Sequence, residues 1–178
     1  IGLRDKDPGA RRLEKVANKL TDPDMRVRAE AASVLHAVGR AAEGQAKALV
    51  AALDDPEEVV RVNASHALVR IKAPLAVTGP ALRRVMAKDH SDEVRAHGAL
   101  ALGQVASQWD DATATDVIKA LDDVHGEVRA AAIWAMTQAP ARARKILPKI
   151  KSLAADETPD VRYAVEEAIR VLEGEADK

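Results

Sequence analysis

The sequence predicts an all-α protein built from about five repeats of a helix pair, with ten helices in total. Three observations support this fold class. The dipeptide Val-Arg recurs with its arginines 33, 34, 34 and 33 residues apart. Apolar residues around each arginine follow the period of an α-helix. The 178 residues include 47% hydrophobic but only 2% aromatic residues and no phenylalanine. A core of small aliphatic side chains suits closely packed helices better than a β-sandwich.

Each repeat also places an aspartate six residues before its arginine. The five pairs are Asp22 and Arg28, Asp55 and Arg61, Asp89 and Arg95, Asp123 and Arg129, and Asp156 and Arg162. Five matches at a constant spacing indicate an internal repeat. Small residues three positions after the arginine and larger aliphatic residues seven positions after it share one helical face. Each Val-Arg dipeptide therefore begins an amphipathic helix, called a Val-Arg helix below.

A second helix, the return helix, is expected after each Val-Arg helix. Pro80 and Pro140 fit the first turn of such a helix, where the missing N–H costs little. Pro148 lies inside the last return helix and should kink or split it. We expect one domain over residues 1–178, with a lone helix at 8–20 and repeats near 22–53, 55–88, 89–121, 123–154 and 156–173. Because the chain starts with Ile1 and in the middle of a helix pair, we expect a piece of a longer array.

The segments LDDPEEVVRVNASHALVRI (53–71) and LDDVHGEVRAAAIWAM (121–136) resemble the HEAT-repeat family. They are most similar to its short bacterial form, the phycobilisome-lyase-type HEAT-like repeat. The resemblance covers about residues 20–172 and implies a right-handed α-α superhelix. It places the Val-Arg helices on the convex side and the return helices on the concave side. It also implies that the repeated aspartates and arginines form a structural ladder between neighbouring repeats.

The residues favour binding over catalysis. The absence of cysteine excludes disulfides, thiolate zinc sites and cysteine nucleophiles. No two of the five histidines stand three or four residues apart, and His90 and His125 lie beside aspartates that are typical of helix caps. We therefore expect no enzyme activity, no metal and no cofactor. No apolar run approaches the roughly 20 residues that span a bilayer, so we expect a cytoplasmic protein.

Basic residues gather on the return helices, although the net charge of the chain is −1. This basic face comprises Arg11, Arg12, Lys15, Arg83, Arg84, Lys88, Arg142, Arg144, Lys145, Lys149 and Lys151. Two interpretations stay open. Lysine and arginine favour the last turns and solvated faces of helices. Alternatively, the face binds an acidic protein segment or nucleic-acid phosphates.

Apolar residues occupy positions on the Val-Arg helices that should point away from the core. They are Val62, Leu100, Trp134 and Tyr163. Leu100 and Trp134 stand at the same offset in consecutive repeats, so they should be lateral neighbours. An exposed patch of this kind indicates a surface for a partner or for self-association. The alternative is a helical phase shifted by one residue, with Trp134 partly buried. Trp109, just before a helix, should pack under its loop.

The sequence thus predicts a non-enzymatic scaffold or adaptor that binds another protein. Two alternatives remain open. One is binding of nucleic acid or another polyanion through the basic return helices. The other, implied by the resemblance, is an accessory subunit of a chromophore lyase-like or other modifying complex.

Overall fold

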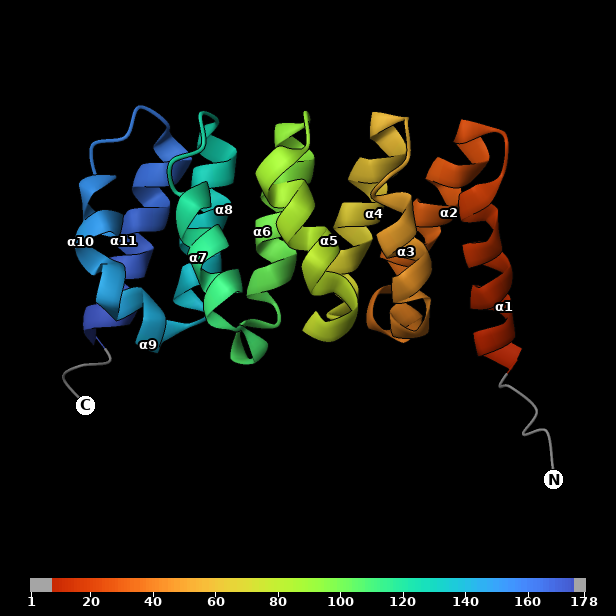
Figure 1. The fold of residues 1–178 in the computed structure, drawn as a ribbon, viewed down its shortest axis with the longest axis horizontal. Helices are drawn as coiled ribbons and strands as arrows, with labels where there is room; N and C mark the ends of the chain where they lie inside the picture. Colours follow the sequence, from red (N-terminus) through yellow and green to blue (C-terminus); the bar gives the residue numbers. More distant parts are fainter. Residues whose placement is uncertain (1–7, 175–178) are drawn as a thin grey trace, which may run out of the picture. The chain divides into compact units, whose positions relative to one another are not determined.

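The computed structural model describes residues 8–174, which form helices and turns without a β-strand (Figure 1). The predicted all-α repeat fold is confirmed. The chain divides between Ala73 and Pro74 into two compact units. No helix in the described part of the chain is both long and apolar enough to cross a membrane.

The first unit holds two Val-Arg helices, which pack side by side. Its elements are α1 (Pro8–Ala17), a 3-10 segment (Asn18–Thr21), α2 (Met25–Val38), a 3-10 segment (Gly39–Gln45), α3 (Ala46–Ala52) and α4 (Glu58–Ile71). The helices α2 and α4 carry the repeat arginines, and α1 and α3 are return helices. Gly39 follows α2 with a φ of +65°, a left-handed conformation that glycine adopts without strain.

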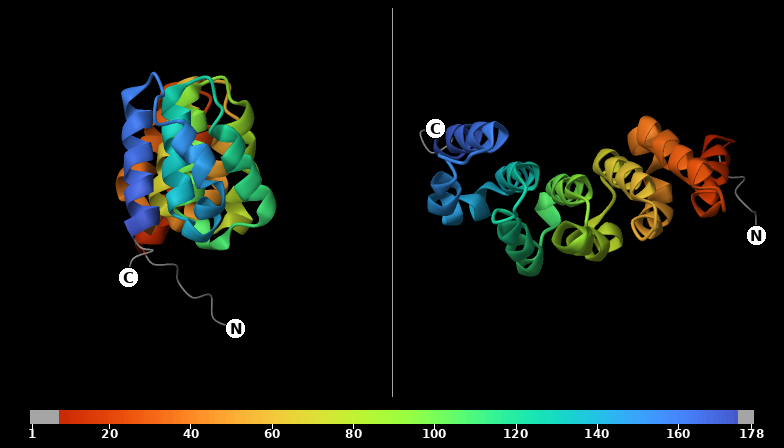
Figure 2. Two further views of the ribbon diagram at one scale, coloured as in Figure 1. Left: turned by 90° about the vertical axis from the view of Figure 1, so that its left-hand side faces the viewer. Right: turned by 90° about the horizontal axis from the view of Figure 1, so that it is seen from above.

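The second unit holds a row of three Val-Arg helices, α6, α8 and α11, packed in that order. Its elements are α5 (Leu75–Lys88), α6 (Asp92–Gly103), a 3-10 segment (Ala106–Gln108), α7 (Asp111–Ala120), α8 (Gly126–Thr137), α9 (Pro140–Ala143), a 3-10 segment (Arg144–Ile146), α10 (Leu147–Ser152) and α11 (Pro159–Gly174). The return helices α5 and α7, with the broken helix α9–α10, form a second row beside the first (Figure 2).

Two prolines explain the course of the return helices. Pro148 has no N–H to donate to the carbonyl of Arg144, and the last return helix is split at residues 144–146 into α9 and α10. This split gives eleven α-helices between residues 8 and 174 in place of the ten expected. The placement of Pro80 in a first turn is wrong, because α5 already begins at Leu75 behind Pro74. Pro80 is tolerated inside α5 at an exposed position, where water can reach the carbonyl it leaves free.

Three of the repeated arginines join their Val-Arg helix to the turn of the next repeat within the same unit. Within the first unit, Arg28 Nε lies 2.6 Å from Asp55 Oδ2. Within the second unit, Arg95 Nε lies 2.9 Å from Asp123 Oδ2, and Arg129 Nε lies 2.9 Å from Asp156 Oδ2.

Each arginine also holds the turn of its own repeat. Its second guanidinium nitrogen donates to the backbone carbonyl of the aspartate six residues earlier. The acceptors for Arg28, Arg61, Arg95, Arg129 and Arg162 are the carbonyls of Asp22, Asp55, Asp89, Asp123 and Asp156, at 2.7 to 2.9 Å. For the three arginines that also bind the next aspartate, one side chain thus fixes two successive turns. This double role is a physical reason for the constant spacing between aspartate and arginine.

The carboxylates of these pairs titrate at low pH. Burial raises the pKa of Asp123, but the hydrogen bond from Arg95 and the bond from the His125 backbone lower it more, so the pKa lies below its ordinary value. The hydrogen bond from Arg129 likewise lowers the pKa of Asp156. Both carboxylates are therefore ionised near neutral pH and remain paired with their arginines.

The second unit bends toward its row of Val-Arg helices. Seen from above, α6, α8 and α11 lie on the inner side of the bend and the return helices on the outer side (Figure 2). The convex placement of Val-Arg helices is therefore wrong for this unit. The reason is close packing: a β-carbon on Gly103 of α6 would lie 2.6 Å from Trp134 Cζ3 and 2.9 Å from Ala135 Cα of α8. Small residues at this contact allow α6 and α8 to approach closely, so the helices of the inner row can be spaced more closely than those of the outer row.

Candidate functional site

An apolar groove runs across the inner row of the second unit. It has a volume of about 660 Å³ and is lined by residues of α6, α8 and α11. Its floor is built from small side chains, which are Ala96, Ala130, Ala131, Ala164 and Ala168. The surface is hollow because these alanines carry no atoms beyond the β-carbon where longer side chains would fill the space.

Three large side chains stand in this groove, one from each helix. We call Leu100 of α6, Trp134 of α8 and Tyr163 of α11 the apolar row. Leu100 and Trp134 are half-buried, whereas Tyr163 is 66% exposed. The indole of Trp134 packs on Gly103, so one part of the ring is covered and another faces the groove. The structure therefore brings together three of the four residues singled out on the Val-Arg helices.

The fourth residue of that set lies elsewhere. Val62 belongs to α4 in the first unit, where it is half-buried, and it does not line the groove. Sequence reasoning also missed Val171, which lines the groove from the later part of α11. Val171 stands eight residues after Tyr163, a spacing that returns to the same helical face and could have revealed it.

The rim of the groove is acidic. Glu127, Asp160 and Glu167 line it, and the lining includes no lysine or arginine. Glu167 forms an ion pair with Arg170 one turn further along α11. His97 also lines the groove, and its Nδ1 lies 2.7 Å from the backbone carbonyl of Glu93.

At least four of the eleven cations of the predicted basic face form ion pairs with acids of neighbouring elements. The pairs are Arg83 with Asp116 at 2.5 Å, Arg142 with Asp111 at 2.6 Å, Lys149 with Asp122 at 2.7 Å and Lys151 with Glu173 at 2.5 Å. Arg144 donates to the backbone carbonyl of Leu172 at 3.1 Å. The remaining members, Arg11, Arg12, Lys15, Arg84, Lys88 and Lys145, are exposed, the first three on α1 of the first unit.

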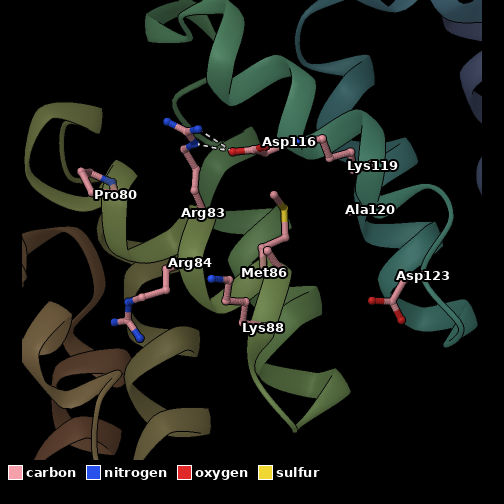
Figure 3. A pocket seen from close by; sticks show the side chains of 10 residues that line it. Pro80, Arg83, Arg84, Met86, Lys88, Asp116, Lys119, Ala120 and Asp123 are labelled. Atoms are coloured by element: carbon pink, nitrogen blue, oxygen red, sulfur yellow. Dashed lines mark hydrogen bonds and ion pairs between the residues drawn. The ribbon is translucent and has the colours of Figure 1, made fainter.

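Part of this face is hollowed between α5 and α7 (Figure 3). The hollow has a volume of about 630 Å³. At its edge, Asp116 accepts from Arg83 Nε at 2.7 Å and from Lys119 Nζ at 3.0 Å. Burial raises the pKa of Asp116, but the hydrogen bonds from these two cations lower it by a larger amount. The pKa therefore lies below its ordinary value. Asp116 therefore partly neutralises Arg83 and Lys119. Arg84 and Lys88 also line the hollow, so basic residues outnumber acidic ones there.

Two other residues noted in the sequence have structural contacts. Trp109 is only 6% exposed and its Nε1 donates to the Leu102 carbonyl at 2.9 Å, so it packs under its loop as expected. The imidazole Nδ1 of His125 lies 3.3 Å from Asp92 Oδ2. His90 is exposed in the turn before α6.

Comparison with known protein families agrees with the ladder and the paired helices. A model of HEAT repeats matches residues 13–103 and, in an overlapping match, residues 46–137. The chain belongs to the HEAT-repeat family. A comparison with curated protein sequences gives no match.

Solved structures similar to this HEAT-repeat chain are themselves repeat solenoids. The complex of CpcE and CpcF of phycocyanin lyase from Nostoc sp. PCC7120 matches with a TM-score of 0.75 and 23% identity, over 93% of this chain and 66% of that one. A designed armadillo repeat protein, YIII(Dq)4CqI, matches with a TM-score of 0.69 and 21% identity, over 92% and 83%. Another designed armadillo repeat protein, solved in complex with the peptide (KR)4, matches with a TM-score of 0.66 and 21% identity, over 92% and 87%. These similarities concern the fold.

Proposed function

We propose that this HEAT-repeat chain is a non-enzymatic scaffold that binds a segment of a partner protein in the groove of its second unit. The observation that supports this most directly is the apolar row, which crosses three successive helices on a hollowed surface. Exposed aromatic side chains in such a hollow are typical anchors of protein interfaces. The alanine floor gives a bound chain room to approach the helices closely.

The similar solved structures support the same function. One is described in complex with a peptide, and another is a complex of two different chains. Stacked repeats form extended surfaces, which suit a bound segment better than a closed reaction site. The fold alone does not name the partner, because repeat proteins vary their exposed residues.

Replacing Trp134 by alanine is expected to weaken peptide binding at least tenfold, because truncation of an aromatic anchor typically costs about 2 kcal/mol or more. Peptides would first be selected from a random library on the full chain. Their dissociation constants would then be measured by fluorescence anisotropy for the chain and its variants. Because Trp134 is half-buried, Tyr163→Ala, at an exposed position, serves as a second variant with an undisturbed core.

Val124→Ser is the matched control, because Val124 is 82% exposed and does not line the groove. We expect this variant to bind the selected peptides like the unmodified chain. Two results would contradict the proposal. One is a library selection without enrichment, and the other is unchanged affinity in both Trp134→Ala and Tyr163→Ala.

A second candidate function is an accessory subunit in chromophore attachment, favoured by the TM-score of 0.75 with the phycocyanin lyase complex. The groove volume also lies in the range of small-molecule sites, roughly 300 to 1,000 Å³. Under this hypothesis, adding a free bilin should shift its absorption spectrum and induce circular dichroism, and Trp134→Ala should reduce both changes. Unchanged spectra at equimolar bilin would count against it.

The charge pairs on the return helices argue against the polyanion-binding alternative. Arg83, Arg142 and Lys149 each already contact a carboxylate. A phosphate backbone would have to displace these acids or approach against their charge. Protein binding in the groove is therefore the better supported function.

A further inference from the structure

We propose that the segment bound in the groove is a short peptide with an apolar anchor flanked by lysine or arginine. This proposal rests on the proposed function and specifies the chemistry of the partner. It follows from the positions of the acidic residues relative to the apolar row.

Acidic residues stand beside the aromatic residues on two of the three helices. On α11, Asp160, Tyr163 and Glu167 follow the spacing i, i+3, i+7, which places them on one helical face. On α8, Glu127 and Trp134 are seven residues apart, again two turns along one face. Each helix thus presents an anchor position and a carboxylate to the same groove.

The acidic residues also align across the helices. Glu127 and Asp160 each precede the repeat arginine of their helix by two residues, so they occupy equivalent positions on neighbouring, parallel helices. Both are exposed. Among the described residues, 8–174, neither forms an ion pair. The helix dipole stabilises acidic residues in the first turn of a helix, which accounts for Glu127 and Asp160. It does not account for Glu167, which lies in the middle of α11.

The charge of the groove selects against other partners. A segment rich in aspartate or glutamate would meet carboxylates of its own sign on the rim, and such contacts suppress binding. A basic segment would gain attraction from two exposed carboxylates and from the faces of Tyr163 and Trp134, which also attract cations. The rim acid and the aromatic residue of α8 are about 10 Å apart along the helix axis. An extended peptide covers this distance in about three residues.

The proposal predicts that basic flanks strengthen peptide binding at least fivefold. Three fluorescent ten-residue peptides with a central Leu-Phe pair would be compared, with lysine, glutamine or glutamate three positions to either side. We expect affinity to fall in that order, and the advantage of lysine over glutamine to shrink when salt rises from 50 to 300 mM, because exposed charges are screened.

The matched variant pair isolates the rim. Glu127→Gln combined with Asp160→Asn should reduce binding of the lysine peptide to about that of the glutamine peptide. Glu166→Gln is the control, because Glu166 is an exposed glutamate of α11 that does not line the groove. We expect Glu166→Gln to leave all three affinities unchanged. The proposal is overturned if the glutamate peptide binds as tightly as the lysine peptide, or if the double variant binds the lysine peptide unchanged.

The same measurements separate this proposal from the proposed function. If all three peptides bind equally and Tyr163→Ala weakens each of them, the groove binds protein segments without selecting basic ones. If no peptide binds and library selection also fails, the proposed function itself is contradicted.

Discussion

Replacing Arg95 by methionine is expected to lower the free energy of unfolding by about 3 kcal/mol. Arg95 is only 8% exposed. It donates to Asp123 at 2.9 and 3.0 Å and to the backbone carbonyl of Asp89 at 2.9 Å. Methionine keeps most of the packing volume but removes these bonds. The carboxylate of Asp123 would then remain ionised and largely buried without its cation, which is the costly state.

Urea unfolding followed by circular dichroism measures this effect. Adding Asp123→Asn to Arg95→Met should recover part of the loss, because the unpaired charge is removed. Arg170→Met is the matched control: Arg170 pairs with Glu167 on an exposed helix surface, where such pairs contribute little to stability because water and salt screen them. A loss for Arg95→Met no larger than that for Arg170→Met would show that the ladder does not stabilise the unit.

Replacing Gly103 by alanine is expected to destabilise the chain by about 2 kcal/mol and to weaken peptide binding as well. In most helices this change is favourable by about 1 kcal/mol. Here the added β-carbon would overlap Trp134 and the backbone of Ala135, at 2.6 and 2.9 Å. The helices α6 and α8 would have to separate, and the indole of Trp134 would shift in the groove.

The same unfolding and anisotropy measurements test this prediction. Gly174→Ala is the control, because Gly174 also ends a helix and its β-carbon would meet no atom within 4 Å. We expect Gly174→Ala to be neutral or slightly stabilising. Equal stability of the two variants would mean that the contact between α6 and α8 relaxes easily. Unchanged peptide affinity of Gly103→Ala would mean that the position of Trp134 in the groove does not depend on this contact.

The sequence predicted the helices well because burial repeats with the helical period. The Val-Arg dipeptides marked the helix starts, and Pro148 marked the break in the last return helix. The start of α5 was less predictable, because Pro74 and Pro80 both follow rules for helix starts and only one of them stands there. The direction of the bend was not predictable. It depends on small differences in helix spacing between two rows, which a hydrophobic pattern does not contain.

The candidate site was predictable in part. The positions of Leu100, Trp134 and Tyr163 relative to the repeat arginine located the apolar row. The depth of the groove depends on alanines, which leave a hollow only once three helices pack side by side. Part of the basic face is paired with acids of other elements, which the charge of each single helix does not reveal. The pairs Arg83–Asp116 and Lys149–Asp122 join residues 33 and 27 positions apart. A search for opposite charges about one repeat length apart could have found them.

The double role of the ladder arginines has a consequence for how such an array can change in length. Each arginine needs only an aspartate six residues earlier and an identical turn in the following repeat. A whole repeat within a unit can therefore be duplicated or removed, and each arginine that is followed by another repeat of that unit still finds both acceptors. Insertion of a single residue between an aspartate and its arginine would instead disturb two turns at once. The geometry of the ladder therefore permits the array to grow by whole repeats. Each added repeat also lengthens the groove by one helix.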